Sequence, residues 1–275
     1  MPALAPAGLS DLHVHSQFSC DSRSSMEAIG RRAVELGLRS IAFTDHLDLV
    51  PADPCAGFYR PAAYLAELER CRALFDGRLT IRGGVEVGEI HWFEREIAAL
   101  LAEHPYDLVI GSVHWVDGYL VFDPAFFQTR STEDALRAYF AELLRMCQHG
   151  GFDVLGHLDI VKRFGTAQPD GFSAARYEPE IRAVLAALVE GGIGLELNTS
   201  TLRRPVNQTS PTPAVLRWYR ELGGELLTLG SDAHHPDDLA ADFTAAIEMV
   251  RSAGFGHLAD YERRTPRLVP LEDLA

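Results

Sequence analysis

Short apolar runs that turn polar at their C-terminal ends alternate with amphipathic segments along the chain, and this alternation restricts the possible folds more than any other feature. Alternating strands and helices imply parallel strands joined by right-handed crossovers, and seven such units favour a closed barrel over an open sheet. The sequence therefore predicts an α/β barrel. The seven predicted strands lie at 8–15, 38–46, 79–87, 106–114, 152–157, 193–198 and 225–234.

The segments between these strands carry helix signals. Ser24 and Glu27 are spaced as a capping box, and Gly37 is placed to end the helix that they open. Further helices are predicted after Pro61, after Ser131, and roughly at 177–190, 213–222 and 238–253. The chain of 275 residues contains no repeat, linker or low-complexity segment, so we expect a single domain over residues 1–275.

The charge balance restricts the class of ligand. The chain has 25 Lys and Arg against 39 Asp and Glu, a net charge of −14. Such a surface repels nucleic acid and anionic lipid, so we expect neither nucleic acid nor a membrane as a partner, and the sequence does not indicate an oligomeric state. A phosphate substrate would require bound cations that reverse the local field.

The termini and cysteines predict a cytoplasmic location. The N-terminal segment MPALAPAGLS lacks the basic and apolar parts of a secretion signal, and no apolar run is long enough to span a membrane. The cysteines show no paired spacing, which favours free thiols in a reducing compartment over a disulfide framework or a zinc finger. They are Cys20, Cys55, Cys71 and Cys147, of which we expect Cys20 to be a packed thiol.

Histidines and carboxylates collect where the predicted strands end, which is the side of such a barrel that holds active sites. His13 and His15 share one face of the first strand, and Asp11 on that face is a candidate to orient a histidine. Each residue alone is a weak signal, but nine donors facing one pocket would require cations. The nine are His13, His15, Asp21, His46, Glu86, His114, His157, Asp232 and His234.

Nine donors exceed the needs of one transition metal ion, which must keep a position open for water. The set therefore predicts two or three divalent ions. Mixed imidazole and carboxylate ligands suit zinc, manganese or iron and do not distinguish between them.

The order of the motifs resembles the polymerase and histidinol phosphatase (PHP) family, and specifically its histidinol-phosphatase branch, over nearly the full length. The resemblance implies a distorted seven-stranded TIM-like (β/α)7 barrel, the PHP fold, with a trinuclear metal site. The motifs are DLHVHSQFSCDS at 11–22, TDH at 44–46, GVEVG at 84–88, GSVHWVDG at 111–118, GHLDIVKRFG at 156–165, LELNTSTLRRP at 195–205 and GSDAHHP at 230–236.

The resemblance also implies how the ligands divide. One ion would be held by His13, His15, Glu86 and Asp232; a second by Glu86, His114 and His157; and a third by Asp21, His46 and His234. Glu86, Asp232 and His234 are expected to be catalytic as well. Arg163 and Arg203 or Arg204 resemble the phosphate-binding arginines of the branch, and whichever of Arg203 and Arg204 points outward would be a solvated surface charge.

The implied reaction is hydrolysis of L-histidinol phosphate to L-histidinol and phosphate, a step of histidine biosynthesis, by attack of a metal-bound hydroxide. Thr201 and the segment VNQTSPT depart from the usual sequence of the branch at these positions, and this departure bears on the details of substrate recognition. One alternative is another PHP phosphoesterase that acts on nucleotides, phosphotyrosine or nucleic acid as a 3'-5' exonuclease. The other is a non-catalytic metal-binding module.

Overall fold

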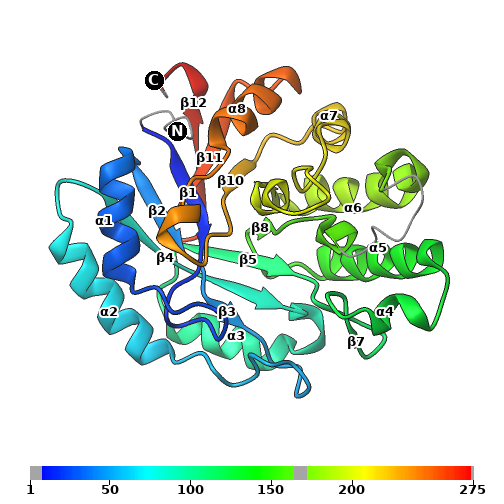
Figure 1. The fold of residues 1–275 in the computed structure, drawn as a ribbon, viewed down its shortest axis with the longest axis horizontal. Coiled ribbons are helices and arrows are strands. Elements are labelled where there is room, and N and C mark those ends of the chain that lie inside the picture. Colours follow the sequence, from blue (N-terminus) through cyan, green and yellow to red (C-terminus); the bar gives the residue numbers. More distant parts are fainter. Residues whose placement is uncertain (1–7, 164–171, 274–275) are drawn as a thin grey trace.

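The computed structural model describes residues 8–163 and 172–273 and has a row of parallel strands with helices packed around it (Figure 1). The strands follow in the order β1 (Ser10–Val14), β2 (Ser40–Phe43), β4 (Thr80–Gly88), β5 (Leu108–Ser112), β8 (Val154–Leu155), β9 (Gly194–Asn198) and β10 (Leu227–Gly230). After β10, the N–H of Asp232 donates to the carbonyl of His13, and Ala233 accepts from the N–H of His15. These bonds nearly close the row, so the predicted seven-stranded α/β barrel is confirmed.

Helices follow most of the strands and cover the outside of the barrel (Figure 1). The α-helices are α1 (Met26–Leu36), α2 (Pro61–Leu74), α3 (Glu94–Glu103), α4 (Ala125–Gln128), α5 (Thr132–His149), α6 (Glu178–Gly191), α7 (Pro213–Glu221) and α8 (Phe243–Ser252). Short 3-10 helices are η1 (Ile90–Trp92), η2 (Ile160–Arg163), η4 (Ala174–Tyr177), η5 (Ser200–Arg203), η6 (Pro236–Asp238) and η7 (Leu271–Asp273).

The first helix differs from its prediction at one end. Ser25, not Ser24, caps α1, because its side chain accepts from the N–H of Ala28. Ser24 instead donates its hydroxyl to the carbonyl of His234, 3.0 Å away, which ties this loop to the chain after β10. The predicted capping box is therefore wrong by one residue, whereas the predicted end at Gly37 is confirmed by its left-handed conformation, with φ of 72°.

Three small β elements were not predicted. They are β3 (His46–Leu47), the pair β6 (Trp115–Val116) and β7 (Tyr119–Leu120), and the hairpin of β11 (His257–Glu262) and β12 (Thr265–Pro270). Ala259 and Tyr261 of β11 join an apolar cluster whose other buried members lie on the barrel strands. Successive strand residues point to opposite faces of the sheet. This cluster therefore fills the barrel interior, while the alternate residues of the same strands point outward and pack against the helices. The Tyr261 hydroxyl donates to the carbonyl of Asp153, just before β8, so the hairpin lies at the N-terminal ends of the strands, away from the ligands.

The cysteines differ from the expectation. Cys20 and Cys55 form a disulfide, whereas Cys71 and Cys147 are free and buried. The two bridged residues lie 35 apart in the sequence and are brought together by the loops after β1 and β3, so their spacing gives no signal. The expectation that all four are thiols is wrong, and cytoplasmic location stays a prediction that the cysteines no longer support. No helix in the described part of the chain is long and apolar enough to cross a membrane.

Glu142 on α5 fastens this helix to η1 and has a pH-dependent effect on stability. Its carboxylate pairs with His91 and Arg145 and accepts from the Trp92 indole N–H at 2.7 Å. Burial raises the pKa of Glu142, but hydrogen bonds from His91 and Arg145 outweigh it and lower the pKa from 4.5 to about 2. A lowered folded pKa stabilises the fold above the unfolded pKa, and the contribution disappears as pH falls from 4.5 toward 2.

We therefore expect Glu142→Gln to lower the free energy of unfolding at pH 7 by about 1.5–3 kcal/mol, the range for hydrogen bonds to a charged group. The difference between the two proteins should shrink steadily below pH of about 4.5, because both side chains then become neutral. Urea unfolding of both proteins from pH 7 downward measures this. An equal difference at all pH values would contradict the assignment.

Candidate metal centre

All nine predicted ligands lie together at the C-terminal ends of the barrel strands. His13 lies on β1, His46 on β3 and Glu86 on β4, and the others follow strand ends in the chain. The parallel barrel explains the meeting, because every strand presents the same end to the same side. The structure therefore brings the predicted residues into one cluster, while their assignment as ligands stays a prediction.

Glu86 lies at the centre of this cluster and is buried. Among the described residues, its Oε2 atom has no hydrogen-bond partner, although histidine nitrogens lie close to it. A buried carboxylate oxygen without a hydrogen bond is costly in free energy, and a cation among these donors would remove that cost, so the residues present fit divalent metal ions. Five histidines place a ring nitrogen within 3.6 Å of the carboxylate, namely His13, His15, His46, His114 and His157.

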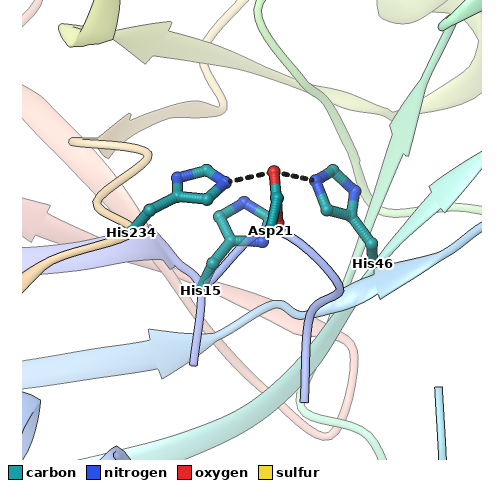
Figure 2. Close-up of side chains that lie close together, drawn as sticks. All are labelled: His15, Asp21, His46 and His234. Carbon is teal, nitrogen blue, oxygen red and sulfur yellow. Dashed lines mark hydrogen bonds and ion pairs between the residues drawn. The ribbon is translucent and has the colours of Figure 1, made fainter. Parts of the chain in front are cut away.

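A second part of the cluster surrounds Asp21, which lies between His46 and His234 (Figure 2). The Asp21 Oδ2 atom is 2.9 Å from His234 Nε2 and 3.6 Å from His46 Nε2. His15 lies beneath them, its ring stacked on that of His234 with centroids 4.2 Å apart. Ligand atoms of these four residues lie within 4.8 Å of one another, close enough to hold one ion.

Further groups of donors meet the same spacing, and they overlap. They are His13 with His157 and Asp232; His13 with His15 and Glu86; and His46 with Glu86 and His114. These groups differ in two places from the ligand sets implied by the resemblance. They put His15 together with Asp21, and His157 together with Asp232. Which residues share an ion therefore stays a prediction.

The carboxylates of the cluster depend on positive charge, and burial lowers the pKa of His13 and His114 while the neighbouring carboxylates Glu196 and Asp48 bring it well above its usual value. Burial raises the pKa of Glu86, but the charges of His46 and His13 hold it well below its usual value. Burial likewise raises the pKa of Asp232, and His13 brings it well below the usual range. Burial and the charges of His234 and His46 lower the pKa of His15 to about 3, so His15 is the neutral imidazole that a metal requires. The carboxylates are thus ionised and depend on positive charge nearby.

Two carboxylates that were not predicted to belong to the site contact the Nδ1 atoms of histidines in the cluster. Glu196 Oε1 lies 2.7 Å from His13 Nδ1, and Asp48 Oδ1 lies 3.2 Å from His114 Nδ1. Asp11, predicted for such a role, instead accepts from the N–H groups of Ser231 and Ala240. The strand pairing shifts register between Asp11 and Val14, which interrupts the regular alternation that would place Asp11 and His13 on one face. A carboxylate inside the apolar run LELN was the signal that could have identified Glu196.

Three arginines line the same cleft as the ligands, namely Arg163, Arg203 and Arg204. Arg203 Nη2 donates to the carbonyl of Ser231 at 2.8 Å, and its buried Nη1 has no hydrogen-bond partner among the described residues. Burial and the charge of Arg204 lower the pKa of Arg163. Both Arg203 and Arg204 line the cleft, although Arg204 is exposed, and this cationic group is suited to an anion with several oxygens. Phe164 and Gly165 of the same motif lie outside the described residues.

The cleft opens on the side of Asp21 and His234. The side chains of these residues are 46% and 31% exposed, whereas those of His13 and Glu86 are at most 1% exposed. A ligand entering the cleft would thus meet Asp21 and His234 first, with the buried donors beneath.

The chain is similar in sequence to proteins of a known family. The family model for the PHP domain matches residues 11–200. The chain is 30% identical to a probable histidinol-phosphatase of Deinococcus radiodurans over 253 residues, which is 90% of this chain and 94% of that protein. It is also 30% identical to a histidinol-phosphatase of Lactococcus lactis over 91% of this chain and 93% of that one.

A solved structure agrees with the fold. The crystal structure of histidinol phosphate phosphatase from Lactococcus lactis, in complex with zinc, L-histidinol and phosphate, matches with a TM-score of 0.88 and 28% identity. The match covers 95% of this chain and 99% of that one.

Proposed function

Because the chain belongs to the PHP domain family, we propose that it is a metal-dependent phosphomonoesterase that hydrolyses L-histidinol phosphate to L-histidinol and inorganic phosphate, a step of histidine biosynthesis. One observation supports this most: a buried cluster of histidines and carboxylates shares a cleft with three arginines. The cluster fits metal ions, and the arginines fit a phosphate.

We assign two or three divalent ions, zinc, manganese or iron, to the nine residues. Glu86 would be a shared ligand, because its two oxygens face different histidines: Oε2 faces His13 and Oε1 faces His157. Bound ions of this kind lower the pKa of water from about 15.7 toward about 7 and neutralise charge on a phosphoryl group. The donors must be deprotonated to bind, which His15 already is.

The side chains around the ions would bind and orient the ester. The guanidinium groups of Arg163, Arg203 and Arg204 donate in a planar fork that suits phosphate oxygens. Arg203 is held in place by Ser231 and by Asp238, whose carboxylate lies 3.3 Å from its Nε atom. Because the guanidinium is fixed before the substrate arrives, little entropy is lost on binding. His234 lies on the open side and Asp232 lies beside it, with Oδ1 3.6 Å from His234 Nδ1, so both would lie near the entering phosphate.

L-Histidinol phosphate is the substrate that best fits this cleft. Its cationic amine is complementary to a chain with a net charge of −14 and to Asp238, an acidic residue of the cleft. The related protein of Lactococcus lactis was crystallised with L-histidinol and phosphate.

A substrate panel tests this proposal. The protein loaded with zinc, manganese or iron should release phosphate from L-histidinol phosphate with a kcat/KM at least about 100-fold above that for phosphotyrosine peptides, nucleotides and sugar phosphates, equivalent to about 2.7 kcal/mol of discrimination. Preference for another ester would keep the metal chemistry and overturn the substrate. Phosphate binding without turnover of any ester would favour a non-catalytic module.

Replacing Arg203 with Ala should raise KM for L-histidinol phosphate about 10- to 100-fold, because a charge-assisted contact worth about 1.5–3 kcal/mol is lost. Phosphate release at several substrate concentrations measures the effect. Arg217→Ala, at an exposed position on α7, serves as the control and should leave KM unchanged. Equal KM values for both variants would exclude Arg203 from phosphate binding.

A further inference from the structure

Glu196 is a buried carboxylate on β9 that belongs to none of the donor groups described above. Both of its oxygens are occupied. Oε1 lies 2.7 Å from His13 Nδ1, and Oε2 accepts from the backbone N–H of His157 at 2.7 Å and from the Asn198 amide at 3.2 Å. Glu196 does not line the cleft, so it would act through other residues and not on the substrate.

The contact with His13 determines which nitrogen of that ring is available. With Nδ1 bound to the carboxylate, Nε2 points into the cluster, where it lies 3.1 Å from His15 Nε2, 3.4 Å from Glu86 Oε2 and 3.9 Å from Asp232 Oδ1. A carboxylate behind an imidazole fixes its tautomer and orientation, and the partner is needed for full metal affinity.

The second oxygen fixes a histidine from a different strand end. By accepting from the N–H of His157, Glu196 holds the backbone that carries this ring, and His157 Nε2 lies 2.9 Å from Glu86 Oε1. One carboxylate on β9 therefore connects the ends of β1 and β8. The two histidines that it holds meet opposite oxygens of Glu86.

The end of β10 leaves room for this arrangement. A Cβ atom at Gly230 would lie 2.1 Å from Glu196 Oε1 and 2.6 Å from the Cβ of His13. Any side chain at this position would thus displace the carboxylate or the ring. Glycine at 230 is therefore required by the contact between Glu196 and His13.

We propose that Glu196 is a positioning residue that aligns His13 and His157 together, so that their Nε2 atoms converge on Glu86. The inference rests on the proposed metal centre. Asp11 provides a contrast, because it is equally buried but accepts, within the described part of the chain, from the backbone N–H groups of Ser231, Ala240 and His13. Asp11 would support the fold, whereas Glu196 would set the affinity for metal.

Zinc affinity of Glu196→Gln and Asp11→Asn, measured by competition with a chromophoric chelator, separates the two roles. Glutamine keeps the shape but replaces one acceptor oxygen with a donor, so it cannot serve His13 and His157 at once. We expect Glu196→Gln to bind zinc about 10- to 100-fold more weakly. Asp11→Asn should lower the melting temperature of the metal-free protein and leave zinc affinity within about threefold, below the range for such partners.

Unchanged zinc affinity in Glu196→Gln would overturn the proposal, as would equal losses of zinc affinity in both variants. If the wild-type protein itself bound no zinc, manganese or iron, the metal centre would fail, and with it this inference; the chelator assay distinguishes that result because it requires no phosphatase activity.

A measurement on the unaltered protein tests the same point without a variant. Ring nitrogen NMR of the zinc-loaded protein should show His13 protonated on Nδ1 and metal-bound through Nε2. Binding through Nδ1 would contradict the position of Glu196, because the carboxylate occupies that nitrogen.

Discussion

Replacing Glu86 with Gln should lower kcat for phosphate release by at least about 1000-fold, which corresponds to about 4 kcal/mol in the activation free energy. The carboxylate is buried, and both of its oxygens face histidine nitrogens. The amide has the same shape but no charge, and its nitrogen cannot accept or coordinate. The cluster then loses its central anion, and with it the charge that would hold two ions side by side.

Steady-state phosphate release, together with metal content, tests this expectation. Glu142→Gln is the matched control, because Glu142 is also a buried glutamate but pairs with His91 and Trp92 outside the cleft. It should keep kcat within about twofold of the wild type. A Glu86→Gln protein with full kcat and full metal content would show that Glu86 is not a central ligand.

Removing the metal should abolish activity and lower the melting temperature by about 10 °C. A ligand present at about 1000 times its dissociation constant stabilises a fold by about 4 kcal/mol, and each kcal/mol shifts the melting temperature of a chain of this size by about 2–4 °C. Without ions, Glu86 Oε2 has no hydrogen-bond partner among the described residues. Thermal unfolding and phosphate release before and after treatment with a chelator measure both effects.

Zinc added back should restore activity and melting temperature together. His114→Ala, which removes one donor beside Glu86, should show a smaller chelator effect than the wild type. An unchanged melting temperature after complete removal of metal would contradict a structural contribution of the ions, and unchanged activity would contradict the metal-dependent reaction.

The barrel could be predicted because its strands carry a strong local signal. Each run such as YDLVIGSVH is apolar along its length and polar at its end, which is typical of a buried parallel strand. The hairpin of β11 and β12 carries no such signal, because β12 is mostly exposed. Its place is decided by Ala259 and Tyr261, which fill the interior of a barrel that must already exist. Long-range packing of this kind is not encoded in a local pattern.

That the nine candidate ligands lie together could be predicted for the same reason as the barrel, since parallel strands carry their C-terminal residues to one side. The carboxylates that contact the histidines of this cluster could not be predicted. Whether Asp11 or Glu196 reaches His13 depends on the register shift between Asp11 and Val14 and on the space left at Gly230. Likewise, Cys20 and Cys55 meet only through the path of two loops.

Anomalous diffraction from crystals of the zinc-loaded protein with phosphate is the most direct test of the proposed metal centre. We expect two or three zinc peaks about 2.0–2.2 Å from ligand atoms of the nine residues, with Glu86 between ions and a phosphate contacting Arg203. Zinc peaks elsewhere, or none among these nine residues at full zinc loading, would contradict the proposed metal centre.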